Sequence, residues 1–183
     1  MDKETWRFIN TFAPWLSAIG TLAAVIVSLY FARRDKKIRL DISAGHRLIA
    51  IPGQVVRPEH KDWLVIKVTN IGHREAQITN IGWTVGFFKK HGSIQVNFDT
   101  PAGQPGMSSP IPVRLKDGEE ATYFISLNQS DWINTFFDEY LQLHPKLRIR
   151  SARVLAFTSV GNVFKSRIEK GLREKILEKR TTK

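Results

Sequence analysis

The chain has 183 residues, of which 42% are hydrophobic and 25% are charged, and its formal net charge is +11. This composition supports a packed core and argues against a disordered chain. The chain contains no cysteine, which excludes disulfides, thiol catalysis and zinc sites built on thiolates.

The first predicted element is a membrane-spanning helix over residues 8–32. This stretch contains no formally charged residue, and about 20 mainly apolar residues are enough to cross a bilayer core as a helix. Trp15, Tyr30 and Phe31 belong to the aromatic types that prefer the headgroup level. Residues 1–7 would then form a short external tail, and residues 33–37 a basic juxtamembrane segment.

A cleaved signal peptide, a buried core helix and an interfacial helix are the alternatives for this stretch. A signal peptide is disfavoured because residues 1–7 carry as many acids as bases and a basic cluster follows the apolar run. Core helices are rarely apolar on every face, and an interfacial helix needs a charged face. The positive-inside rule places the N-terminus outside and the rest in the cytoplasm, so we expect a single-pass protein of a bacterial inner membrane. The residues expected to contact lipid headgroups are Arg33, Arg34, Lys36 and Lys37.

Small residues recur along the predicted span at intervals of three or four positions. Such stripes let helix backbones approach closely and are used in transmembrane association. We therefore expect the anchor to self-associate into a homo-oligomer, the alternative being that small residues are simply common in membrane helices. The residues of this stripe are Ala13, Ser17, Gly20, Ala24 and Ser28.

Residues 38–165 are predicted to form a mainly β domain, either a sandwich or a barrel. Short segments of alternating apolar and polar residues are separated by turn signals at roughly ten-residue spacing, as in all-β domains. Ser130 is expected to cap a helix over residues 131–143 that covers one open end of the sheets. The predicted strand segments are 38–42, 63–69, 76–88, 94–98, 121–127 and 147–158.

Residues 166–183 are predicted to form a basic amphipathic helix and tail. Ser166 and Glu169 have the spacing of a capping box. The apolar stripe of this helix is formed by Ile168, Leu172, Ile176 and Leu177. Residues 146–183 carry twelve basic and three acidic residues, a net charge of +9. Such a helix packs its stripe on the sandwich, lies on an anionic membrane or binds nucleic acid.

The sequence contains no pattern that indicates catalysis. The five histidines are scattered, and neither a Gly-x-Ser-x-Gly motif nor a phosphate-binding glycine loop is present. We expect a protein that is not an enzyme and needs neither a metal nor a cofactor. Basic residues on or beside predicted strands suit anion binding, and Arg148 and Arg150 would share one strand face. The predicted anion-binding residues are His73, Arg74, Lys89, Lys90, Arg148, Arg150 and Arg153.

The segment Val65–Gly72 followed by Ala76–Gly82 resembles the central strands of bacterial immunoglobulin-like sandwiches. The whole layout is similar to single-pass bacterial membrane proteins with a cytoplasmic sensor domain. These include antiviral effectors in which a cyclic oligonucleotide binds an oligomeric domain and the membrane is perturbed. The resemblance implies a nucleotide-type ligand. The alternative is a membrane-tethered adaptor that recruits a partner protein, with its basic segments contacting only lipid. Nucleic acid is less favoured because the basic regions lack interleaved aromatic residues.

Overall fold

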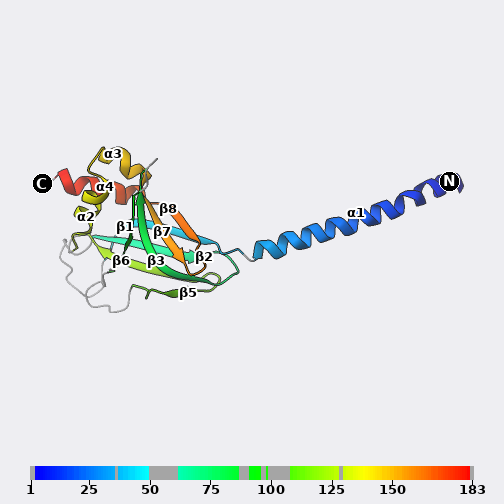
Figure 1. The fold of residues 1–183 in the computed structure, drawn as a ribbon, viewed down its shortest axis with the longest axis horizontal. Helices are drawn as coiled ribbons and strands as arrows, with labels where there is room; N and C mark the ends of the chain where they lie inside the picture. The colour runs from blue at the N-terminus through cyan, green and yellow to red at the C-terminus, as the bar shows by residue number, and fades with distance from the viewer. Residues whose placement is uncertain are drawn as a thin grey trace. The chain divides into compact units, whose positions relative to one another are not determined.

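The computed structural model describes residues 3–35, 37–49, 62–86, 91–95, 98, 108–127 and 130–181. The chain divides into two compact units, Met1–Lys37 and Ile38–Lys183. The first unit is the single helix α1 (Lys3–Asp35) (Figure 1). Within it, Thr11–Arg33 has a mean hydropathy of 1.9 and is long and apolar enough to cross a membrane. Its apolar side chains are exposed, Trp15 and Leu16 by 70% each, unlike those of a buried core helix. The predicted apolar helix is confirmed.

The second unit contains two antiparallel sheets and three helices (Figure 1). One sheet has the order β1 (Leu40–Leu48), β2 (Asp62–Asn70), β6 (Glu120–Ser126). The other sheet is built around β3 (Ala76–Val85), which pairs with β4 (His91–Gln95), β5 (Val113–Leu115) and β7 (Arg153–Thr158), and β7 pairs with β8 (Val163–Arg167). The helices are α2 (Trp132–Tyr140), α3 (Pro145–Arg148) and α4 (Lys170–Thr181). The predicted mainly β domain with a helix near its C-terminal end is confirmed.

The core of this domain draws on both sheets. Leu64 and Ile66 of β2 and Ile78 and Ile81 of β3 are fully buried in one hydrophobic cluster. Alternate side chains of β2 face the core. Two of them, Leu64 and Ile66, lie opposite Ile125 and Tyr123 of β6. Burying one such aliphatic side chain stabilises a fold by roughly 1.5–3 kcal/mol. The two sheets therefore act as the two layers of one sandwich.

Helix α4 completes the core, although it begins later than predicted. Ser166 lies in β8 opposite Val154 and does not cap a helix, so the predicted capping box is wrong. Strand pairing with β7 continues to Arg167 and delays the helix until Lys170. Of the predicted apolar stripe, Ile168, Leu172 and Ile176 are buried in the shared core and Leu177 packs against it, although Ile168 precedes the helix.

The segment after α2 differs from the prediction. Helix α2 lies within the predicted range 131–143, but Asp131 occupies its N-cap and the Ser130 hydroxyl donates to the Ser126 carbonyl. Residues 147–151 were expected to begin a strand, yet they form α3 and a 3-10 turn, Ile149–Ser151. Pro145 occupies the first turn of α3 and favours helical backbone there. Two alternating pairs are too few to distinguish a strand from one helical turn.

Asn70 ties two turns together at one end of the sandwich. Its fully buried amide group donates to the carbonyls of Arg74 and Leu115, at 2.9 Å each, and its carbonyl oxygen accepts from the Gly72 amide at 3.0 Å. The Asn70 backbone bonds to Glu119 and Gly118 in the β5–β6 turn. One buried side chain thus satisfies three backbone groups that belong to two separate connections.

Replacement of Asn70 by alanine is expected to lower the free energy of unfolding by about 2–4 kcal/mol, because three buried backbone groups lose their partner. Chemical denaturation of the detergent-solubilised protein, followed by tryptophan fluorescence, measures this loss. The control Asn162→Ala, at an exposed turn position, should change stability by no more than about 0.5 kcal/mol. Equal stability of the two variants would contradict the role given to Asn70.

Candidate functional site

The candidate site is a groove between α4 and the segment formed by α3 and the 3-10 turn. Its volume is about 350 Å³. Four of its residues are cationic, one is acidic and two are apolar. We call it the basic groove, and its lining residues are Lys146, Ile149, Arg150, Lys170, Arg173, Glu174 and Leu177.

Local helical geometry places these residues on facing surfaces. Lys170, Arg173, Glu174 and Leu177 follow the i, i+3, i+4, i+7 spacing of one helix face. On the other side, His144 adopts a left-handed backbone (φ 52°) and Pro145 then starts α3. The resulting helical turn brings Lys146 and Arg150 into the same groove.

The groove offers cationic hydrogen-bond donors with little compensating negative charge. Lys170 forms an ion pair with Glu174 at 3.6 Å, but both side chains are more than 60% exposed, and such pairs contribute little. Within the described part of the chain, the buried Nε of Arg173 has no hydrogen-bond partner. Guanidinium and ammonium groups around an apolar floor suit a ligand that carries phosphate or carboxylate groups.

Ion pairs with the first sheet hold α4 beside the groove. Arg47 of β1 donates to both carboxylate oxygens of Glu169 at 2.7 and 2.8 Å, and the Glu169 amide donates to the Ala44 carbonyl at 2.9 Å. The hydrogen bond from Arg47 lowers the pKa of Glu169, and the bond to Glu169 raises the pKa of Arg47. Gly45 leaves room for the pair, because a Cβ there would collide with the Glu169 carboxylate and the Arg47 guanidinium.

A second set of charges secures the next turns of α4. Lys175 lies 3.0 Å from Asp62 of β2, and the same carboxylate contacts His46 Nε2 at 2.7 Å. The Lys175 and Asp62 side chains are only 27% and 15% exposed, so solvent screens this pair less than a surface ion pair. Ion pairs made by Glu169, just before α4, and by Lys175 within it thus hold the helix that carries Lys170 and Arg173 against the first sheet.

Of the predicted anion-binding residues, only Arg150 lines the basic groove. His73 lies in the β2–β3 turn, 2.8 Å from Asp117, and Arg74 lies in the same turn. Arg153 is an exposed residue of β7 opposite Arg167. Arg148 belongs to α3, so the strand face that it was expected to share with Arg150 does not exist. Lys89 and Lys90 lie outside the described residues.

Three of the groove cations are not among the predicted anion-binding residues: Lys146, Lys170 and Arg173. The helical spacing of the two α4 residues was a usable signal. No local sequence signal indicated that these residues lie near Lys146, because that proximity depends on the tertiary contact between α3 and α4. Within the described residues no group of three His, Asp or Glu side chains could hold a metal ion.

The residues predicted for helix association all lie in α1, and a Cβ at Gly20 would meet no atom within 4 Å. They are Ala13, Ser17, Gly20, Ala24 and Ser28. Of the predicted headgroup contacts, Arg33 and Lys37 are exposed. Lys36 and the Arg34 side chain lie outside the described part of the chain.

The chain is only weakly similar to solved structures of other proteins. No protein-family model matches the chain, and the comparison with curated proteins gives no match. The chain is similar to a Bordetella pertussis protein described as an ApaA candidate, with 16% identity, a TM-score of 0.31, and coverage of 73% of this chain and 91% of that one. A structural genomics target, SoR45, is 13% identical with a TM-score of 0.24 over 74% and 84% of the two chains. Likeness at this level carries no argument about function.

Substitution of Glu169 by glutamine is expected to reduce stability at neutral pH by at most about 1 kcal/mol, because the pair with Arg47 is more than one-third exposed. Since the pKa of Glu169 is lowered in the folded protein, its contribution is present above the unfolded pKa. This contribution to stability is lost as the pH falls through the pKa that Glu169 has in the folded protein.

Denaturation at a series of pH values between neutral and acidic tests this expectation. The difference between wild type and Glu169→Gln should shrink on acidification. Glu174→Gln, a control on the same helix with a more exposed and longer ion pair, should stay within about 0.5 kcal/mol of wild type throughout. A difference that persists unchanged at acidic pH would refute the assigned ion pair.

Proposed function

We propose that this chain is a non-enzymatic membrane protein whose β domain binds an anionic ligand in the basic groove. One observation carries the proposal: Arg150, Arg173 and two lysines surround an apolar floor, and the buried Nε of Arg173 has no partner within the described residues. An unpaired buried donor is costly unless a water molecule or a ligand satisfies it. Phosphate groups with an attached apolar or planar moiety fit this combination of guanidinium donors and aliphatic surface.

The proposed location is a bacterial inner membrane, with the short N-terminal tail outside and the β domain in the cytoplasm. Support comes from the apolar stretch Thr11–Arg33 and from the charge difference between its flanks. Lys3 and Arg7 precede the stretch, whereas Arg33, Arg34, Lys36 and Lys37 lie at its end, and positive charge is retained on the cytoplasmic side.

The anchor is proposed to self-associate through its small-residue stripe, and ligand binding would then act on a membrane-embedded oligomer. A defence effector that perturbs the membrane is the specific form suggested by the layout. The stripe supports this form because side chains no larger than serine allow two helix backbones to come close. A tethered adaptor is the competing form, in which a partner protein and not a small anion occupies the domain.

Binding of inorganic pyrophosphate to the detergent-solubilised full-length protein, measured by calorimetry, tests the groove. Arg150→Gln is expected to weaken binding by about tenfold, the loss of one charge-assisted hydrogen bond. Arg153→Gln removes the same charge from an exposed strand position and should leave the affinity within about twofold. Binding should also weaken with rising salt. Equal effects of the two variants, or no binding of pyrophosphate, would argue against the groove and favour the adaptor.

Replacement of Ala24 by leucine is expected to reduce self-association of the anchor, because the larger side chain separates the packed backbones. Association is measured by crosslinking and by the mass of the detergent-solubilised particle. Ala18→Leu places the same added bulk on another face of α1 and should leave the oligomer intact. An unchanged oligomer in both variants would contradict the proposed interface.

A further inference from the structure

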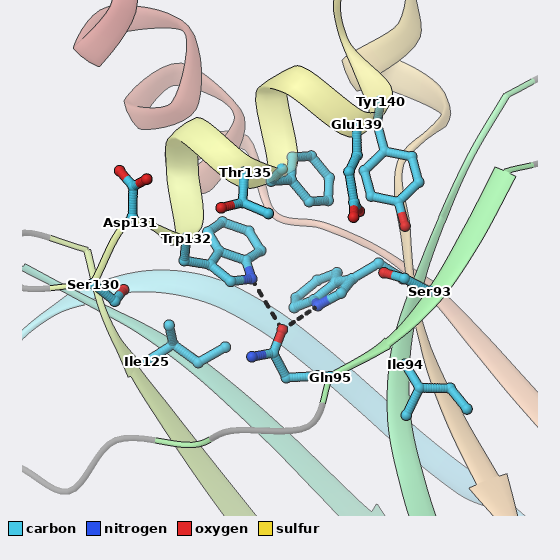
Figure 2. Close-up of a pocket in the computed structure, with 12 residues that line it drawn as sticks. Ser93, Ile94, Gln95, Ile125, Ser130, Asp131, Trp132, Thr135, Glu139 and Tyr140 are labelled. Atoms are coloured by element: carbon cyan, nitrogen blue, oxygen red, sulfur yellow. Dashed lines mark hydrogen bonds between the residues drawn. The ribbon is translucent and has the colours of Figure 1, made fainter.

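A second pocket of different character lies between α2 and the edge strand β4 (Figure 2). Its volume is about 420 Å³, which is within the range of small-ligand sites. One face of α2 forms the upper wall through residues at helical spacing, namely Trp132, Thr135, Phe136, Glu139 and Tyr140. β4 contributes Ser93, Ile94 and Gln95, and β3 contributes Trp83.

The wall of this pocket is a continuous set of aromatic rings. Trp132 stacks on Phe136 with ring centres 4.8 Å apart, and the Trp83 ring lies 5.2 Å from Trp132. Tyr140 extends the series, 5.1 Å from Phe136. Trp83 is buried and Trp132 is partly exposed, so aromatic surface reaches solvent at the pocket. Aromatic faces carry partial negative charge and attract cations.

The indole donors of the wall are already used. The side-chain oxygen of Gln95 accepts hydrogen bonds from Trp83 Nε1 at 3.2 Å and from Trp132 Nε1 at 3.1 Å (Figure 2). A ligand therefore meets ring surface and not free N–H groups on these two residues.

Charge in the pocket has the opposite sign to that in the basic groove. Both of its ionisable acids, Asp131 and Glu139, are exposed, and the described lining includes no lysine, arginine or histidine. In Figure 2 the Glu139 carboxylate extends from α2 toward the interior of the pocket, beside Tyr140. A carboxylate above aromatic rings is the combination that recognises organic cations.

We infer that this aromatic pocket binds a small organic cation with an alkylammonium group, held by Glu139 and by the exposed ring surface of Trp132. The inference does not depend on anion binding in the basic groove, because the two sites share no residue. Alkylammonium groups occur in soluble amines and in zwitterionic lipid headgroups. The experiment must distinguish these two sources.

Choline is the test probe, and 3,3-dimethylbutan-1-ol is its neutral isostere. The indole ¹⁵N–¹H resonances of Trp83 and Trp132 in the full-length protein, in maltoside micelles, report occupancy at the pocket wall. Choline should shift these two resonances saturably, while the isostere should bind at least about fivefold more weakly, since it lacks the charge. Equal affinity for the two compounds, or no shift with choline, would overturn the inference.

Glu139→Gln keeps the size of the side chain and removes its charge. This variant is expected to weaken choline binding about five- to tenfold. The matched control Asp138→Asn removes a charge from the adjacent exposed position of α2, which does not line the pocket, and should bind choline as wild type does. An equal loss of choline affinity in both variants would mean that only the net charge of the protein matters, and it would refute the site.

Lipid nanodiscs separate the two sources of the cation. If phosphatidylethanolamine nanodiscs shift the Trp83 and Trp132 resonances without added choline and phosphatidylglycerol nanodiscs do not, the ligand is a lipid headgroup. If only free choline shifts them, the ligand is a soluble amine. Both results support recognition of an alkylammonium group. Non-zero shifts of equal size in phosphatidylethanolamine and phosphatidylglycerol nanodiscs would count against it.

Discussion

The docking of α4 on the sandwich is the constraint from which the rest of the β domain follows. Ile168, Leu172 and Ile176 are fully or nearly fully buried in the same core as the two sheets, and burial of such side chains is the largest favourable contribution to folding. Because the stripe faces inward, the lysines and arginines of the helix must face elsewhere. The basic groove is therefore a consequence of how the core is closed and not an addition to a finished fold.

The basic groove and the aromatic pocket differ in the kinds of side chain that line them. Helix α4 presents cations beside aliphatic surface, whereas α2 presents aromatic rings beside carboxylates. The two helices contact each other, and Figure 1 shows them with α3 at one end of the sheets. One end of the sandwich thus carries two pockets whose charged lining residues are mainly of opposite sign.

Local sequence patterns predicted the apolar N-terminal helix, the strongest strands and most of the α4 stripe, because each depends on residues that are near neighbours in the chain. Patterns failed where a distant contact decided the outcome. Ser166 and Glu169 have the spacing of a helix cap, yet pairing with β7 keeps Ser166 in a strand and Arg47 binds the Glu169 carboxylate. Similarly, Arg150 was predicted to lie on a strand face, but it lies in a 3-10 turn and lines a groove with residues of α3 and α4.

The contact between Arg47 and Glu169 joins positions 122 residues apart. This contact can form only after nearly all of the intervening chain is available, because loop closure must precede a non-local contact. During synthesis, the docking of the segment around Glu169 on β1 is therefore a late event, whereas helix α1 is the first element of the chain to emerge.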